Sequence, residues 1–367
     1  MGWSHCLGNP ITAPVFMGLA RSVVTTGLLT VAMPHAQAGS ETRSGTSLLP
    51  GPGTGTTEQI CTLTLVKTPV TITGSHKTVE NLRIESTTGT ALTVSDATDI
   101  EIRNLHIRHA NGRGIAILNS KRIVIRNIII ESTDAPTNGP HRKDTNENIF
   151  TYQSELVQVN NARLYRGSSG IYMLESDNAR LSGIYGEDFR GPYPRGQFVQ
   201  FDNSHNAVLT DFHTISFPKS WPEDNINIYQ SENAVIKLGV IDGNNAPNGV
   251  GIMFDGGTAS GRVEDVDAIR MGNGSFSAYD GTNDATFIRT RSRDDICTDQ
   301  GRGKPSSGGT IWTGNPRLNG LTVTDSTFDN PCFQVVWPRS AFKTLQIKQE
   351  AFAMRSVNRP SMCWENS

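Results

Sequence analysis

Ile102-Arg103-Asn104-Leu105-His106-Ile107 is followed 23 residues later by Ile125-Arg126-Asn127-Ile128-Ile129-Ile130. An earlier copy, Asn81-Leu82-Arg83-Ile84, places its Asn 23 residues before Asn104. Apolar residues alternate with polar ones in each copy, which is the pattern of a strand with one buried face. The Asn between the strands accepts the left-handed conformation of a tight turn and can hydrogen-bond along a stack of copies. The stretch therefore predicts strands stacked at a fixed period.

The same frame continues along the chain with Asn, Asp or Gly at the turn. Its later copies are Val159–Leu164, Leu181–Ile184, Leu209–Phe212, a weaker one at Ile236–Gly239, Val263–Val266 and Val323–Ser326. A leucine-rich horseshoe is disfavoured because its Leu-rich consensus is missing, and a β-sandwich would not keep this register. The expected fold is all-β, a single-stranded right-handed parallel β-helix of about nine to ten coils.

The composition agrees with many short strands joined by tight turns. The chain has 367 residues and contains 36 glycines, which favour turns. Its formal net charge of −2 argues against a general nucleic-acid binder or a protein that coats anionic membranes. Selectivity for a charged ligand must then come from local clusters.

The N-terminus has the features of an export signal. Arg21 precedes the apolar stretch Val23–Met33, and Ala36-Gln37-Ala38 supplies a small-x-small cleavage pattern. Met17 can serve as the start, and the apolar stretch is too short for a membrane span. We therefore expect a secreted or periplasmic protein cleaved after Ala38.

The remaining boundaries follow from composition and from the repeat. The expected parts are a signal peptide at 1–38, a flexible Gly/Thr/Ser-rich leader at 39–57, the β-helix at 58–345 and a C-terminal cap or tail at 346–367.

Four cysteines remain once the segment that holds Cys6 is removed. They are Cys61, Cys297, Cys332 and Cys363. An even number in an exported chain favours two disulfides, with three possible connectivities that the sequence leaves open. No pair has the CxxC spacing of a zinc or redox site.

The repeat resembles the pectin-lyase-like superfamily of right-handed β-helices over about Val70 to Phe328. This resemblance implies the fold, and the superfamily includes polysaccharide lyases, glycoside hydrolases, uronate epimerases and phage tailspike depolymerases. Tailspike relatives are trimers, so the sequence leaves monomer and homotrimer open. A polygalacturonase-type set and an epimerase-type Asp-Pro-His-Asp are absent, and Asp294-Asp295 is isolated. No catalytic residue can be transferred from a family motif.

The register places the first strand of each coil eight or nine residues before the turn frame. These strands are Ala91–Val94, Gly114–Leu118, Ile149–Tyr152, Ile171–Leu174, Phe198–Asp202, Asn225–Tyr229, Val250–Asp255, Phe276–Tyr279 and Thr310–Thr313. The expected inward residues are Ile115, Ile117, Ile171, Met173, Val199, Phe201, Ile226, Ile228, Ile252 and Phe254.

The outward residues of these strands form a different set. They are Tyr152, Tyr172, Gln200, Asp202, Asn227, Tyr229, Met253, Asp255, Tyr279 and Trp312. Aromatic rings stack on sugar faces, and amides and carboxylates hydrogen-bond hydroxyls. The set favours a glycan cleft on the first sheet, although side-chain ladders that merely stabilise the stack are the alternative.

Four long connections are expected at one edge of this sheet, where loops on a rigid scaffold concentrate function. They are Glu131–Glu147, which includes His141; Gly186–Gln197; Phe217–Asn225; and Thr290–Gly309.

Two kinds of cleavage chemistry fit these residues. A hydrolase needs two carboxylates, for which Asp202, Glu223, Asp224 and Asp255 qualify. A lyase needs a cation that neutralises a uronate carboxylate and a base. Its candidates are Arg190, Arg195, Lys219, His141 and Tyr229.

The predicted catalytic residues are Asp202, Glu223, Asp224, Asp255, Lys219 and Arg195. The predicted substrate-binding residues are Tyr152, Tyr172, Arg190, Gln200, Trp221, Asn227, Tyr229, Tyr279, Arg293 and Trp312. No cofactor is certain, Ca²⁺ is possible and no metal ligand is assigned.

The leading interpretation is an exported enzyme that cleaves an acidic, uronate-containing polysaccharide, with β-elimination slightly favoured. A two-carboxylate glycoside hydrolase and a non-catalytic glycan-binding or surface β-helix are the alternatives.

Overall fold

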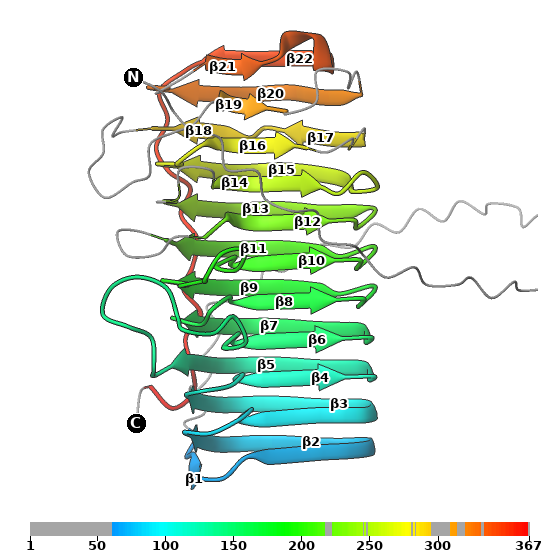
Figure 1. Ribbon diagram of the computed structural model, residues 1–367, viewed down its shortest axis with the longest axis vertical. Helices are drawn as coiled ribbons and strands as arrows, with labels where there is room; N and C mark the ends of the chain where they lie inside the picture. The colour runs from blue at the N-terminus through cyan, green and yellow to red at the C-terminus, as the bar shows by residue number, and fades with distance from the viewer. Residues whose placement is uncertain are drawn as a thin grey trace, which may run out of the picture. The chain divides into compact units, whose positions relative to one another are not determined.

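The computed structural model describes residues 61–216, 222–244, 246, 249–279, 282, 284–294, 309–313, 320–331 and 334–365. The expected signal peptide, the leader, Cys297 and Cys332 lie outside these residues. The described residues belong to one compact unit, Thr57–Ser367, in which parallel strands are stacked in a single column (Figure 1). In this part of the chain no helix is long and apolar enough to cross a membrane.

The stack is an all-β parallel solenoid of about ten coils, as the repeat predicted. One ladder runs through the longer strands. It consists of β1 (Thr64–Val66), β2 (Val70–Ser86), β3 (Leu92–His109), β5 (Lys121–Ser132), β7 (Glu155–Tyr165), β9 (Arg180–Glu187), β11 (Val208–Ile215), β13 (Ala234–Asp242), β15 (Ser260–Ile269), β17 (Asp284–Ile288) with β18 (Arg291–Arg293), β20 (Leu321–Asp329) and β22 (Phe342–Gln349).

A second ladder of short strands continues from the start of β3 and forms the first sheet. It consists of β4 (Ile115–Leu118), β6 (Ile149–Tyr152), β8 (Ile171–Leu174), β10 (Val199–Asp202), β12 (Asp224–Tyr229), β14 (Val250–Asp255), β16 (Gly274–Ala278), β19 (Gly309–Trp312) and β21 (Gln334–Trp337). A short 3₁₀ turn, η1 (Arg339–Ala341), precedes β22.

The predicted first strands match this ladder. All ten residues expected to point inward are buried, and none exposes more than a negligible fraction of its side chain. Consecutive inward positions pair in register, as Ile171 does with Val199 and Val199 with Ile226. The period-two pattern therefore identified both the strands and their buried face.

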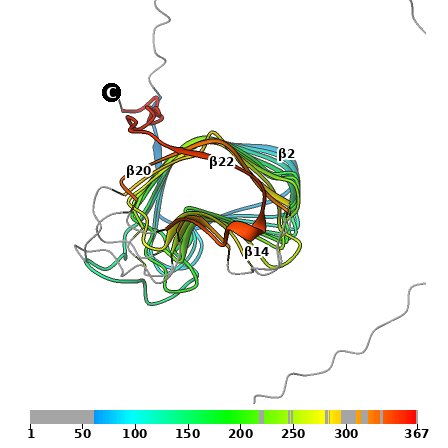
Figure 2. The same cartoon turned by 90° about the horizontal axis from the view of Figure 1, so that it is seen from above.

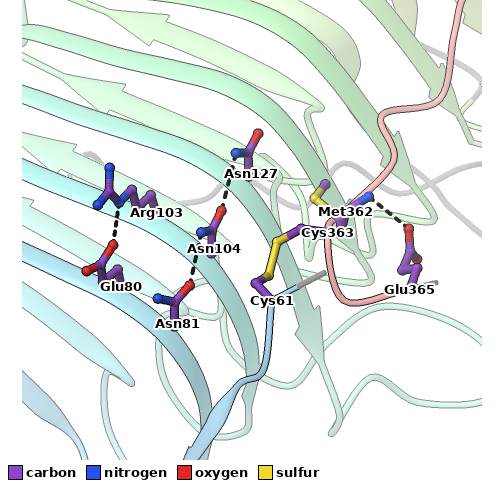
Figure 3. Close-up of a disulfide and its surroundings, with 9 residues drawn as sticks. All are labelled: Cys61, Glu80, Asn81, Arg103, Asn104, Asn127, Met362, Cys363 and Glu365. Carbon is purple, nitrogen blue, oxygen red and sulfur yellow. Dashed lines mark hydrogen bonds and ion pairs between the residues drawn. A yellow bond between two sulfur atoms is a disulfide. The ribbon is translucent and has the colours of Figure 1, made fainter. Parts of the chain in front are cut away.

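The turn of the repeat adopts the expected left-handed conformation. Asn81, Asn104 and Asn127 have φ of 57°, 54° and 54°, which Asn tolerates better than most residues. The side-chain Nδ2 of Asn104 donates to Oδ1 of Asn81 at 3.0 Å, and Nδ2 of Asn127 donates to Oδ1 of Asn104 at 3.3 Å (Figure 3). The ladder of stacked Asn residues is confirmed.

The weaker copy at Ile236–Gly239 differs from the others in a physical detail. Leu238, not Gly239, has the positive φ, at 56°, and half of its side chain is exposed. A Cβ on Gly239 would lie 2.2 Å from the ring of Phe212. Gly239 is therefore required by the close packing of the neighbouring coil and not by the turn.

A second turn is lined by serines that the sequence frame did not reveal. The backbone N–H of Ser120 donates to Oγ of Ser154 in the next coil, at 3.2 Å. The same contact joins Ser154 to Ser176, Ser176 to Ser204 and Ser204 to Ser231. Each serine thus satisfies a buried backbone donor that the strand ladder leaves unpaired.

The C-terminal tail runs back along the outside of the stack after β22 (Figure 1). Nε of Arg355 donates to Oδ1 of Asp267 in β15, at 3.1 Å, and the guanidinium of Arg359 lies 4.9 Å from the ring centroid of Tyr185 in β9. Cys363 then forms a disulfide with Cys61, 302 residues away in the sequence (Figure 3). This is one of the connectivities that the sequence left open, and it ties the tail to the first coil.

Candidate functional site

The loops that lead into the first sheet gather at one corner of the coils. Seen along the stack, the loops of the central coils project beside the side that carries β14 (Figure 2). The described loops are the connection between β5 and β6 and the one between β9 and β10. Most of the connection between β18 and β19, and the part of the β11–β12 connection that holds Lys219 and Trp221, lie outside the described residues.

The outward residues of the first sheet form two parallel rows. The row nearer the strand starts is buried by the loops and consists of Phe150, Tyr172, Gln200, Asn227 and Met253, each less than a tenth exposed. The row nearer the strand ends is half-buried and consists of Tyr152, Leu174, Asp202, Tyr229 and Asp255. Among the described residues of this sheet, the second row is the more exposed and can meet a ligand.

Arg195, in the loop between β9 and β10, reaches over the buried row. Its guanidinium lies 4.0 Å from the ring centroid of Tyr172, and its Nη1 donates to Oε1 of Gln200 at 2.8 Å. The hydroxyl of Tyr172 donates to Oδ2 of Asp202 at 2.9 Å. Burial raises the pKa of Tyr172 to about 12, so this hydroxyl stays a neutral donor. The contacts connect the loop cation to a carboxylate of the open row.

Asp224 opens β12 and is almost fully buried. Its Oδ2 accepts a hydrogen bond from Nδ2 of Asn227 at 2.8 Å, and its Oδ1 accepts one from the backbone N–H of Val250 at 3.0 Å. Burial, together with the nearby charge of Glu223, raises the pKa of Asp224 to about 8. At neutral pH Asp224 therefore retains its proton and orients the amide of Asn227.

Glu223 precedes Asp224 and is only half-buried, so it can meet solvent or a ligand. Burial raises its pKa, and the charge of Asp255 adds to this, whereas a hydrogen bond with Tyr193 opposes it. A carboxyl group with a raised pKa beside a second carboxyl group is the arrangement that general acid catalysis uses.

Five of the six predicted catalytic residues come together at this corner. The charges of Arg195 and Asp255 act on the pKa of Glu223, and those of Glu223 and Asp255 act on the pKa of Asp224. Asp202 is linked to Arg195 through Tyr172, which donates to Asp202 and lies under the guanidinium. Asp202 and Asp255 both pair with Tyr229 in the strand between them, so their Cα atoms are two strand spacings apart, ~9.6 Å. We call these five residues with Tyr193 the carboxylate cluster. Lys219, the sixth candidate, lies outside the described residues.

Two predicted binding cations are placed elsewhere. Arg190 is buried, pairs with Asp188 at 2.7 Å and donates to the carbonyl of Gly139 at 3.2 Å. It therefore joins two loops to each other. Arg293 donates to the carbonyl of Phe352 in the C-terminal tail at 2.8 Å. Neither is brought to the carboxylate cluster.

The predicted aromatic residues differ in their placement. Tyr172 lies in the buried row, whereas Tyr152 and Tyr229 lie in the open row. Tyr279 follows β16 and is 43% exposed. Trp312 ends β19, but its side chain, like all of Trp221, is outside the described part of the structure.

Two features of the site were missed in the sequence. Tyr193, which contacts Glu223, lies in the expected loop Gly186–Gln197 and was not among the predicted site residues. Arg113 pairs with the buried Glu147 at 3.0 Å and lies 3.9 Å from the ring centroid of Phe150, which packs 5.6 Å from the ring of Tyr172. Both features depend on loop conformation. The sequence signal for the second was Arg113, two residues before β4.

A bound metal was left unassigned by the sequence, with Ca²⁺ as a possibility. Among the described residues, no group of three or more His, Cys, Asp or Glu side chains is arranged to hold a metal ion.

Comparisons with known proteins agree with the fold. Residues 61–183 match the family model of the right handed beta helix region. The Dettilon tailspike protein matches with 12% identity and a TM-score of 0.47, over 78% of this chain and 61% of that one. The GH87 alpha-1,3-glucanase from Streptomyces thermodiastaticus strain HF3-3 matches with 11% identity and a TM-score of 0.49, over 73% and 51%. The alginate lyase from Paenibacillus sp. str. FPU-7 matches with 10% identity and a TM-score of 0.49, over 75% and 99%.

No curated protein matches the sequence. The chain spans about three fifths of the length of the tailspike structure and about half that of the glucanase. At these identities and TM-scores the likenesses carry no argument about activity. The family match and the ladders of the first coils nevertheless agree: the described chain is an all-β parallel solenoid, and its first coils match the right handed beta helix region.

Proposed function

We propose that the protein is an exported enzyme that cleaves an acidic polysaccharide by hydrolysis at the carboxylate cluster. The observation that carries this proposal is Glu223, a half-buried carboxyl group with a raised pKa. It belongs to the same cluster as Asp202 and Asp255, which lie in the open row on either side of Tyr229.

In this mechanism Glu223 is the general acid that protonates the leaving oxygen. Asp202 or Asp255 is the second carboxylate and acts as base or nucleophile. Two strand spacings between these aspartates leave room for a sugar over Tyr229. Asp224 is buried too deeply to meet a substrate and acts as a positioning residue, because it holds the amide of Asn227.

The acidic character of the substrate is supported by Arg195. Its charge lies over Tyr172 of the buried row, next to the open row, where it can attract a uronate carboxylate. The aromatic rings of Tyr152 and Tyr229 in the same row supply faces on which sugars stack.

β-Elimination, slightly favoured by the sequence, remains the second candidate because Arg195 can neutralise a substrate carboxylate. The tyrosines nearest to Arg195 and Glu223 weaken it. The pKa values of Tyr172 and Tyr193 are both raised, and a tyrosine that takes up an α-proton needs a lowered pKa. Hydrolysis is therefore the first candidate.

Export is part of the proposal. The disulfide between Cys61 and Cys363 supports it, because such bonds persist mainly in oxidising compartments. Its test is the N-terminal sequence of the protein recovered outside the cytoplasm, which we expect to begin after Ala38. A mature protein that keeps residues 1–38 and stays in the cytoplasm contradicts export.

The test of cleavage is a panel of uronate-containing and neutral polysaccharides incubated with the purified protein. We expect new reducing ends without absorbance near 235 nm, and their loss in Glu223→Gln. Products that absorb near 235 nm would identify a lyase instead. A glycan that is retained on an affinity gel but never shortened would leave a binding protein and overturn the enzymatic proposal.

A further inference from the structure

A separate cavity of about 400 Å³ lies under the loop between β5 and β6, within the size range of small-molecule sites. Its lining includes Asp134, His141, Arg142, Lys143 and Asn146, none of which belongs to the carboxylate cluster. Three contacts fasten the loop to the following turn at residues 166–168, so the cavity is built into the coil. They are His141 Nε2 to the carbonyl of Arg166 at 2.7 Å, the N–H of Asn146 to Oγ of Ser168 at 3.1 Å, and Oγ of Ser168 to the carbonyl of Asp144 at 2.6 Å.

The hydrogen bonds fix how Asn146 presents its amide. Nε2 of His141 faces a carbonyl oxygen and donates to it, and in that tautomer Nδ1 is an acceptor. Nδ2 of Asn146 lies 3.4 Å from this Nδ1 and 2.9 Å from Oδ2 of Asp134. Both amide hydrogens are therefore used, and the reversed amide would bring its oxygen against the Asp134 carboxylate.

As a result, Oδ1 of Asn146 is left without a partner. This atom is buried, the residue is 3% exposed, and no described group donates to it. An unsatisfied buried acceptor costs about 1–3 kcal/mol. An O–H or N–H donor of a ligand in the cavity removes that cost.

Two cations stand at the same cavity. The side chains of Arg142 and Lys143 are exposed and make no described hydrogen bond or ion pair, in contrast to most arginines of the first coils. A ligand that fits the cavity therefore combines hydroxyl donors for Asn146 with an anionic group for Arg142 and Lys143.

We propose that this cavity is an accessory binding site for one acidic sugar unit, a uronate. A uronate hydroxyl donates to Oδ1 of Asn146, and its carboxylate accepts from Arg142 and Lys143. The loop ends at β6, three strand spacings or ~14 Å from β12, and in this proposal a longer chain held here extends towards the carboxylate cluster. This last link, and only this link, rests on the proposed function.

The experiment uses D-galacturonate and D-glucuronate as monosaccharides, which contain no bond to cleave. Binding to the purified protein is followed by ligand-observed NMR titration, with methyl glucoside and inorganic phosphate as reference probes. We expect Arg142→Ala/Lys143→Ala to weaken uronate binding at least about tenfold, since two charge-assisted hydrogen bonds are lost. Asn146→Leu is expected to weaken it several-fold, and the exposed double variant keeps the test valid if Asn146→Leu fails to fold.

A matched control removes the same charges from another sheet. Lys237→Ala/Arg262→Ala in β13 and β15 is expected to change uronate binding less than about twofold. Equal loss in both double variants, or equal binding of phosphate and uronate, overturns the proposal, because either outcome shows attraction of any anion. Equal binding of methyl glucoside overturns the role of the cations.

Failure of this site and failure of the proposed function are distinguishable. If the protein binds uronate through Arg142 and Lys143 but shortens no polysaccharide, the accessory site stands and the proposed enzymatic activity is wrong. If the protein cleaves a polysaccharide but Arg142→Ala/Lys143→Ala leaves uronate binding unchanged, the proposed enzymatic activity stands and the proposed accessory site is wrong.

Discussion

The first coils and the central coils share one turn frame but use their charged residues differently. In β2, β3 and β5 the arginines pair with carboxylates of neighbouring coils, as Arg103 does with Glu80 at 2.5 Å and Arg122 with Asp99 at 2.6 Å. In the central coils, Asp202 and Asp224 accept hydrogen bonds from neutral groups, and the described residues give neither of them an ion pair.

The ion pairs of the first coils stabilise the stack, whereas the carboxyl groups of the central coils belong to the proposed active site. Exposed pairs between coils contribute about 0–1 kcal/mol each. The central coils bury Asp224 and partly bury Glu223, and burial raises both pKa values. The stability of the stack is distributed over many equivalent contacts, whereas its proposed activity depends on a few.

The largest expected effect is on catalysis. Glu223→Gln should reduce the initial rate of reducing-end release by about 10²- to 10⁴-fold, the range of a lost general acid. Glu80→Gln, which removes a carboxylate of the first coils, should leave the rate within about twofold. Equal losses in the two variants would erase the distinction between the regions.

The raised pKa of Glu223 also sets the pH dependence of this rate. The acid form is the active one, so activity should fall as the pH rises through the raised pKa of Glu223. A rate profile that instead rises towards alkaline pH would favour a deprotonated base and hence β-elimination.

The disulfide is the next largest effect. Cys363→Ser should lower the free energy of unfolding by about 2–4 kcal/mol, because the bond closes a long loop. Denaturant unfolding measures this, and hydrogen exchange should show the loss first in the coils near β1 and β2. Uniform loss along the stack would show that the tail stabilises both regions alike.

Asp224 makes the stability of the central coils depend on pH. Its pKa is about 8 in the folded chain and near 3.8 without burial, so the folded state binds the proton more tightly. The contribution of Asp224 to the free energy of unfolding should therefore be largest below about pH 4 and decline as the pH rises towards 8. Asp224→Asn should reduce this decline by at least about 1 kcal/mol, measured by urea unfolding at pH 5 and pH 8.

The smallest effects concern the shared turn. Asn104→Ala should destabilise the protein by about 1–2 kcal/mol, because Ala disfavours a positive φ and two ladder hydrogen bonds are lost. Leu238→Asn should stabilise it by about 0.5–1 kcal/mol, because Leu at the equivalent turn is strained and half exposed. Thermal unfolding of both variants measures these effects. Shifts of Tm in the same direction would contradict a turn conformation shared by the two positions.

Much of the fold follows from the sequence because its signals are local. Alternation at period two identified the inward residues of the first sheet, and Asn or Asp in the frame identified turns such as those at Asn127 and Asp211, with φ of 54° and 53°. The register between coils then follows, because coils with the same repeat pattern bury their apolar residues in only one alignment. These local rules also placed Asp202, Tyr229 and Asp255 on one row.

The tertiary structure alone decided which of those outward residues are covered and what they contact. The loop between β9 and β10 buries Tyr172 beneath Arg195, brings Tyr193 to Glu223, and directs Arg190 to Asp188. Arg293 likewise donates to a carbonyl of the C-terminal tail. Loop and tail conformations depend on contacts between coils far apart in the sequence, and no periodic pattern encodes them.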